Sequence, residues 1–286
     1  MKKFKCGALC AVLAWSAQVA QGNDNPGGWT PVVLDDGVLR FEAHVGAKPA
    51  RIRLGSASPS NAISQKFASS LSIGGEEDDS LALEQQPPLP SVPLFIASRR
   101  VELPQVYRVA DERTDVHAGR DFFSQAIVQI DYPNKRLRVL DEDALKLRDL
   151  ANVPARRVDA EIGTHVRLRI GEVSIWAALA TEYSGALLLP RSLAERHGWL
   201  DGANSSAADV TDDLGDEFRT DAITLKTVHV GPYGINDVST VLMAPGESPL
   251  AGSYEQETAI VGNDILRFFQ VSVDLDRAYV HVQRPE

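Results

Sequence analysis

Cysteine is scarce in this sequence, and basic residues are outnumbered by acidic ones. Only two cysteines occur among the 286 residues, and both, Cys6 and Cys10, lie in the first ten positions. The 29 lysines and arginines stand against 39 aspartates and glutamates, which gives a formal net charge of −10. A nucleic-acid-binding domain usually presents a basic face. We therefore expect no nucleic acid among the partners of this protein.

The first 22 residues have the pattern of an export signal. Three lysines in the first five positions precede an apolar run over residues 6–20, which is shorter than a membrane-spanning helix requires. Ala20 and Gly22 supply the small residues that favour cleavage after Gly22. The sequence predicts a signal peptide over residues 1–22 and an exported protein, periplasmic or extracellular. Cleavage would change the net charge to −13 and remove both cysteines, which excludes disulfides and thiolate chemistry.

Beyond residue 22, no segment is apolar for long enough to span a membrane, and long helical periodicity is rare. Short segments of alternating apolar and polar residues, separated by glycine and proline, indicate an all-β fold. Short helices are predicted at Ser64–Leu71, Glu142–Leu150, Arg191–Trp199 and Asn263–Phe268.

A repeat relates the two halves of the remaining chain. Gly119-Arg120-Asp121 and Gly262-Asn263-Asp264 each begin a predicted helix, and in both halves an aspartate follows the glycine by 12 residues, at a turn between two alternating segments. Earlier in each half, Ala62-Ile63-Ser64 matches Leu188-Leu189-Pro190 at an offset of 126. The offset between the two glycines is 143, so the second half contains 17 additional residues. We assign them to a surface loop at Asp201–Asp221.

Each half also begins with a predicted hairpin. The first runs from Val38–Val45 into Ala50–Leu54, after a turn at Asp35-Asp36-Gly37, and the second runs from Val166–Ile170 into Ser174–Leu179. The predicted organisation is an N-terminal linker at 23–36, a first lobe at 37–150, a linker at 151–163 and a second lobe at 164–286.

The order of these elements resembles the lobe of the retropepsin-like aspartic proteases, and the residues after Gly119 and Gly262 look like that family's helix start. The resemblance covers residues 37–141 and 164–284. Two such lobes in one chain resemble the bilobal, pseudo-two-fold arrangement of pepsin-like enzymes. The resemblance implies two β-barrel lobes with a cleft between them.

In that family each lobe supplies Asp-Thr/Ser-Gly directly after an apolar strand, and the two carboxylates share one proton and activate a water molecule. The corresponding residues in the first lobe are Gly55-Ser56-Ala57, and the offset of 126 places Thr181-Glu182-Tyr183 in the second. The aspartate positions would then hold Gly55 and Thr181. The resemblance thus implies that the catalytic pair is missing and that no residue is catalytic.

The resulting hypothesis is an exported, non-catalytic relative of the aspartic proteases that binds an extended peptide or protein partner in the cleft. Gly55, Ser56, Thr181 and Glu182 are the expected binding residues. An active, atypical aspartic endopeptidase, or another hydrolase on the same scaffold, is the alternative. A nucleophilic Ser56–His117 pair lacks a supporting motif.

No metal or other cofactor is expected, because the six histidines lack the spacing of a helical zinc site. In the resemblance Asp121 and Asp264 are structural residues that cap their helices. The oligomeric state stays open.

Overall fold

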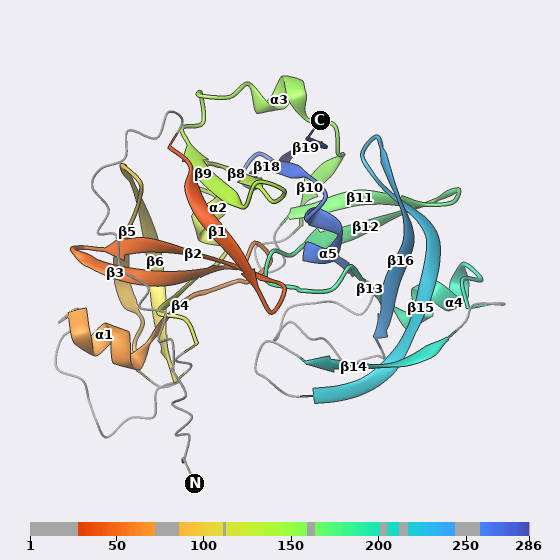
Figure 1. The fold of residues 1–286 in the computed structure, drawn as a ribbon, viewed down its shortest axis with the longest axis horizontal. Helices are drawn as coiled ribbons and strands as arrows, with labels where there is room; N and C mark the ends of the chain where they lie inside the picture. The colour runs from red at the N-terminus through yellow and green to blue at the C-terminus, as the bar shows by residue number, and fades with distance from the viewer. Residues whose placement is uncertain are drawn as a thin grey trace, which may run out of the picture.

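The computed structural model describes residues 28–71, 86–110, 113–158, 164–200, 205–211, 217–243 and 258–285. The predicted signal peptide lies outside the described residues. Strands dominate and the helices are short, so the predicted all-β class is confirmed (Figure 1). None of the helices in the described ranges is both long and apolar enough to cross a membrane.

The first sheet contains eleven strands, nine from the N-terminal half and two from the C-terminus. They are β1 (Thr30–Asp35), β2 (Val38–Val45), β3 (Lys48–Leu54), β4 (Asn61–Ser64), β5 (Leu89–Ile96), β6 (Arg99–Val109), β7 (Val116–Ala118), β8 (Ile127–Asp131), β9 (Arg136–Leu140), β18 (Gln270–Asp274) and β19 (Tyr279–Gln283). Six of these strands close into a barrel in the order β2-β3-β7-β4-β6-β5, because β5 also pairs with β2.

The second sheet contains eight strands. They are β10 (Ala155–Arg157), β11 (Thr164–Ile170), β12 (Val173–Leu179), β13 (Leu187–Pro190), β14 (Ser206–Thr211), β15 (Glu217–Val230), β16 (Tyr233–Met243) and β17 (Ala259–Val261). A second six-stranded barrel closes in the order β11-β12-β17-β13-β16-β15, through pairing of β15 with β11. The two barrels form the predicted bilobal, pseudo-two-fold arrangement.

A central sheet joins the two lobes. The hairpins β8–β9 and β18–β19 pair through β8 and β18, with Val271 opposite Ile130 and Ser272 opposite Gln129. Gln129 donates a hydrogen bond from Nε2 to the hydroxyl of Ser272 at 2.7 Å. The last hairpin of the second predicted lobe therefore belongs to the same sheet as the last hairpin of the first.

Several segments differ from the sequence-based expectation. The predicted N-terminal linker contains β1, which pairs with β2 and β9, and the predicted linker at 151–163 contains β10, which pairs with β11. The predicted loop at Asp201–Asp221 contains β14, which pairs with the start of β15. Composition suggested a loop there, but a free strand edge supplies backbone hydrogen-bond partners whatever the side chains are.

The predicted helices are shorter than expected. They are α1 (Gln65–Leu71), α2 (Arg120–Phe123), α3 (Leu147–Leu150), α4 (Arg191–Arg196) and α5 (Asn263–Leu266). Only the last turn of the helix expected at Glu142–Leu150 forms, as α3. The short helices act as corners between strands, while buried side chains from both lobes, including Phe122 and Phe269, form one continuous core.

His165 on β11 is a buried histidine, and neither of its ring nitrogens has a hydrogen-bond partner among the residues that the structure describes. Burial, and after it the positive charge of Arg156, lowers the pKa of His165 to about 4 from an ordinary 6.5. Between pH 6.5 and pH 4 the unfolded chain therefore binds a proton at His165 that the folded chain does not bind. The free energy of unfolding must fall as the pH is lowered through this window.

We expect the wild-type protein to lose about 2–3 kcal/mol more stability than a His165→Leu variant between pH 7 and pH 4. Urea titrations at both pH values measure this difference. A His44→Gln variant is the control, because it replaces an exposed histidine on another strand and keeps His165. Equal pH dependence in the wild type and the His165→Leu variant would contradict the prediction.

Candidate functional site

The loops that follow β3 and β12 meet between the lobes through a reciprocal pair of hydroxyl groups. The backbone N–H of Ser56 donates to Oγ1 of Thr181 at 3.1 Å, and the N–H of Thr181 donates to Oγ of Ser56 at 3.0 Å. The Ser56 hydroxyl then donates to the Leu179 carbonyl at 2.6 Å, and the Thr181 hydroxyl donates to the Leu54 carbonyl at 3.1 Å. Both side chains are 1% exposed, so the pair joins the lobes within the protein interior.

This reciprocity corrects the predicted alignment of the two lobes. Ser56 and Thr181 make equivalent contacts, so the offset at this point is 125 and not 126. The neighbouring backbone hydrogen bonds give the same offset of 125. The N–H of Gly55 donates to the Ala118 carbonyl at 2.9 Å, and the N–H of Ala180 donates to the Val261 carbonyl at 3.0 Å. The residue equivalent to Gly55 is Ala180. The assignment of Thr181 to the aspartate position was wrong, and Thr181 holds the hydroxyl position.

An inserted residue explains the error. Ala62 lies opposite His117, and Leu188 lies opposite Ile260, so the offset of 126 holds from these strands onward. The loop between the hydroxyl residue and this strand is one residue longer in the second lobe. Matching strands by sequence cannot locate a one-residue insertion inside the preceding loop.

Glu182 directly follows Thr181, so at the offset of 125 it is the equivalent of Ala57 in the first lobe. Its carboxylate accepts a hydrogen bond from the backbone N–H of Ala57, at 3.1 Å to Oε1 and 3.5 Å to Oε2. The side chain is 6% exposed, and its charge contributes, after burial, to raising the pKa of Tyr132 well above the ordinary range. Glu182 therefore holds the loop of the first lobe from across the junction.

Asn263 is a second buried connection between the lobes, and the sequence did not single out its side chain. Its Nδ2 donates to the carbonyls of Thr181 at 2.7 Å and Gly37 at 2.8 Å, and its Oδ1 accepts from the Tyr132 hydroxyl at 2.8 Å. The repeat places Asn263 where the first lobe has Arg120. The difference between Asn263 and Arg120 was the only sign in the sequence that Asn263 has a special role, and it does not identify its three hydrogen-bond partners.

The imidazole of His117 covers Gly55. A Cβ atom on Gly55 would lie 2.6 Å from Cε1 and 2.8 Å from Nε2 of His117. The ring thus occupies the space into which an aspartate side chain would project, and residue 55 can have no side chain while the ring stays there. The Ser56 hydroxyl already donates to Leu179, so the geometry does not favour a nucleophilic Ser56–His117 pair.

The glycines that begin α2 and α5 are required by close packing. A Cβ atom on Gly119 would lie 2.4 Å from the Ser60 carbonyl oxygen, and one on Gly262 would lie 2.5 Å from the Gly185 carbonyl oxygen. These glycines are also the N-cap residues, and neither helix has a side-chain cap. The predicted capping role of the following aspartates was wrong.

Those two aspartates have other partners. Asp121 accepts a hydrogen bond from Asn61 Nδ2 at 3.1 Å, while Asp264 forms an ion pair with Arg267 at 3.0 Å. Oδ1 of Asn61 also accepts a hydrogen bond from the N–H of Gly119 at 2.9 Å, so a side chain from β4 binds the backbone at the start of α2.

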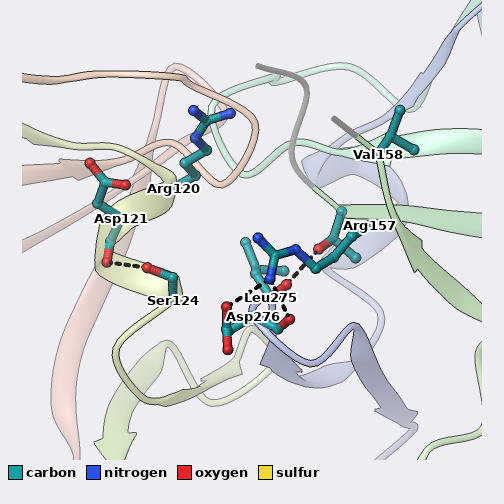
Figure 2. Close-up of a pocket in the computed structure, with 8 residues that line it drawn as sticks. Arg120, Asp121, Ser124, Arg157, Val158, Leu275 and Asp276 are labelled. Atoms are coloured by element: carbon teal, nitrogen blue, oxygen red, sulfur yellow. Dashed lines mark hydrogen bonds and ion pairs between the residues drawn. The ribbon is translucent and has the colours of Figure 1, made fainter. Parts of the chain in front are cut away.

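Two hollows adjoin Asp121. One, of about 240 Å³, lies at the seam between the lobes, and Figure 2 shows Asp121 and Ser124 on one side of it and Arg157 and Asp276 on the other. Its lining residues are Arg120, Asp121, Ser124, Arg157, Val158, Thr164, Leu275 and Asp276. The other, of about 350 Å³, is lined by Pro59, Ser60, Gln105, Tyr107 and Asp121.

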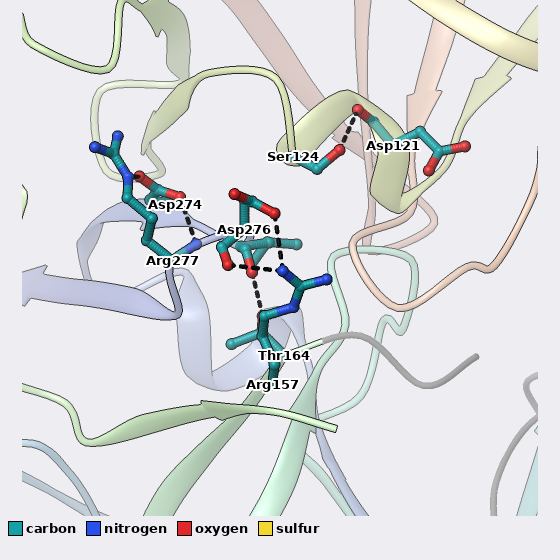
Figure 3. A network of polar contacts seen from close by, with 8 residues as sticks. Asp121, Ser124, Arg157, Thr164, Asp274, Asp276 and Arg277 are labelled. Atoms are coloured by element: carbon teal, nitrogen blue, oxygen red, sulfur yellow. Dashed lines mark hydrogen bonds and ion pairs between the residues drawn. The ribbon is translucent and has the colours of Figure 1, made fainter. Parts of the chain in front are cut away.

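Polar contacts fix the walls of the hollow at the seam (Figure 3). Arg157 donates from Nη1 to the Asp276 carboxylate at 2.9 Å, and Thr164 donates to the Leu275 carbonyl at 3.1 Å. Asp274 in turn accepts from the backbone N–H of Arg277 at 2.9 Å. The turn between β18 and β19 is thereby attached to β10 and β11.

The structure brings Gly55, Ser56, Thr181 and Glu182 together at the junction of the lobes. All four are buried, and none of them lines either hollow. Their role as binding residues stays a prediction. Within the described ranges, no group of three or more histidine, cysteine, aspartate or glutamate side chains could hold a metal ion.

No protein-family model and no curated protein sequence matches the chain. Its structure is similar to the crystal structure of basic 7S globulin from soybean, with a TM-score of 0.49 and 11% sequence identity over 89% of this chain and 94% of that one.

Proposed function

We propose that this protein is an exported, non-catalytic relative of the aspartic proteases that binds an extended peptide or protein segment along the seam between its lobes. One observation carries the non-catalytic part. Gly55 and Ala180 directly precede the reciprocal hydroxyl pair, where the related enzymes have their two aspartates, and neither can ionise.

The remaining groups at the junction do not replace this pair. Acid catalysis of this kind needs two nearby carboxylates that share a proton. Glu182 supplies one carboxylate, and that carboxylate accepts the N–H of Ala57. His117 fills the space above Gly55. What the chain retains is the set of contacts that positions two lobes against each other.

The hollows that meet at Asp121 are the favoured place for a bound segment. The hollow at the seam has side chains from both lobes, and the other hollow, lined by the first lobe alone, reaches Ser60 in the loop that follows the hydroxyl residue. Tyr107, which is 44% exposed, offers an aromatic contact there. In this proposal Gly55, Ser56, Thr181 and Glu182 form the buried base of the binding region, and an extended peptide uses main-chain hydrogen bonds above it.

The experiment combines a cleavage assay with a binding assay. The purified protein is incubated with a diverse peptide pool from pH 3 to pH 7, with and without pepstatin, and the products are analysed by mass spectrometry. We expect no pepstatin-sensitive cleavage but enrichment of a subset of peptides on the immobilised protein. Pepstatin-sensitive cleavage would contradict the proposal in favour of an active endopeptidase.

A pair of variants tests the location. Tyr107→Ser is expected to weaken binding of the enriched peptides at least fivefold, because it removes the exposed aromatic wall. Phe268→Ser is the matched control, since Phe268 is 43% exposed and lines neither hollow. Equal affinities of the wild type and the Tyr107→Ser variant would place the peptide elsewhere.

A further inference from the structure

The outer surface of the second barrel carries an unusual concentration of basic residues. Along β11, Val166, Leu168 and Ile170 are buried in the core, so the alternate residues face outward. Arg167 and Arg169 are exposed on that side, whereas His165, on the same side of the strand, is buried.

The strand register adds residues from three neighbouring strands to the same surface, because directly paired residues of an antiparallel sheet point to the same side. Arg156 lies opposite His165, Trp176 opposite Arg167, and both Ser174 and His229 opposite Arg169. We call this surface the basic face, and it consists of Arg156, Arg167, Arg169, Ser174, Trp176 and His229. None of these residues is acidic.

The three arginines of the basic face are exposed, and no acidic partner of theirs lies within the described ranges. Among the described residues, Arg156, Arg167 and Arg169 form no ion pair, whereas other exposed arginines, such as Arg100 and Arg157, do. Arg156 instead lies over the Trp176 ring, 4.3 Å from its centre. In a chain with a net charge of −10, three exposed guanidinium groups on one surface indicate an anionic partner.

The spacing of the arginines indicates which kind of anionic partner fits this face. Arg156, Arg167 and Arg169 occupy three successive rows of the face, and such rows are about 6.8 Å apart along a strand. Side chains on one side of an extended peptide repeat at the same interval. A carboxylate matches the planar fork of a guanidinium group in a bidentate contact.

We propose that the basic face binds an extended acidic peptide segment that carries carboxylates at alternate positions. This site is separate from the seam between the lobes. Charge complementarity between the three arginines and the carboxylates supports the proposal. Two other anionic partners, a membrane surface and a nucleic acid, fit three arginines less well. A membrane surface contributes only about 1 kcal/mol per basic residue, and a nucleic acid would be repelled by the acidic remainder of the protein.

Two labelled peptides of equal charge test the spacing. One alternates aspartate and serine over six residues, and the other has three consecutive aspartates followed by three serines. Fluorescence anisotropy in 25 mM NaCl is expected to give a Kd at least fivefold lower for the alternating peptide. Equal affinities would overturn the proposal, because binding would then depend on charge alone.

Two triple variants test the surface. Arg156→Gln/Arg167→Gln/Arg169→Gln is expected to weaken binding of the alternating peptide at least tenfold. Arg51→Gln/Arg100→Gln/Arg148→Gln removes the same charge from exposed positions on other elements and should keep the affinity within twofold. Thermal melts establish that both variants fold.

Equal losses of affinity for the alternating peptide in the two triple variants would overturn the assignment of the binding site to the basic face. Vesicles containing anionic lipid, or an oligothymidylate, that bind through the same arginines more tightly than the peptide would overturn the choice of partner. The Tyr107→Ser variant should bind the acidic peptide normally, which separates this test from the one at the seam.

Discussion

Replacing Thr181 by valine is expected to destabilise the protein by about 2–4 kcal/mol, because it leaves two buried backbone groups without partners. The Thr181 hydroxyl accepts from the Ser56 N–H and donates to the Leu54 carbonyl, and valine preserves the shape while removing both bonds. Equilibrium unfolding in urea measures the loss. The two lobes share this contact, so the variant weakens the junction and not only one barrel.

Thr240→Val is the matched control for this prediction. Thr240 is completely buried, but its hydroxyl donates to the Val238 carbonyl, two residues away on the same strand. Its loss is expected to cost about 1 kcal/mol. The double variant Ser56→Ala/Thr181→Val should destabilise the protein by at least about 1 kcal/mol less than the two single variants added together, because both singles break the same reciprocal contact. Additive effects would contradict the coupling.

Replacing Gly37 by alanine is expected to cost about 3 kcal/mol for two reasons that act together. Gly37 has a φ of +74°, where a side chain is strained, and its added Cβ would lie 2.5 Å from Cβ of Ser184 in the other lobe. Gly37 also presents its carbonyl to Asn263. The hairpin tip must therefore move away from the second lobe, and both the midpoint of urea unfolding and the melting temperature should fall.

The Gly46→Ala variant measures the loss of stability that comes from backbone strain alone. Gly46 has a similar φ of +60° at the next hairpin turn, but no atom lies within 4 Å of its added Cβ. Its replacement should cost about 1 kcal/mol, from strain alone. If the two alanine variants lost equal stability, the contact between Gly37 and Ser184 would have no energetic weight.

The sequence predicted the hairpins and the repeated glycines well because these depend on local pattern. Alternation at Val38–Val45 predicts a strand with one buried side, and β2 has those bounds. Gly119 and Gly262 stood out as a repeat, and the structure supplies the reason, which is a close approach of the backbone to Ser60 and Gly185.

Predictions that required an alignment through a loop did less well. The offset of 126 is correct at Leu188, but it misplaces the aspartate position by one residue, at Thr181 and not Ala180. A loop has no period against which an insertion can be detected. The partners of Glu182 and Asn263 were also invisible, since each side chain contacts a segment more than 80 residues away.

The sequence alone therefore determined that the chain forms two related β lobes and that Gly55 cannot supply a carboxylate. Alternation and internal repetition carry that information, because both follow from the geometry of a strand. Only the tertiary structure decided that Ala180 is the equivalent of Gly55, that His117 covers Gly55, and that Arg156, Arg167 and Arg169 share one surface. Those facts depend on which strands are neighbours and in which register, and strand pairing between distant segments is decided by the packing of the whole core.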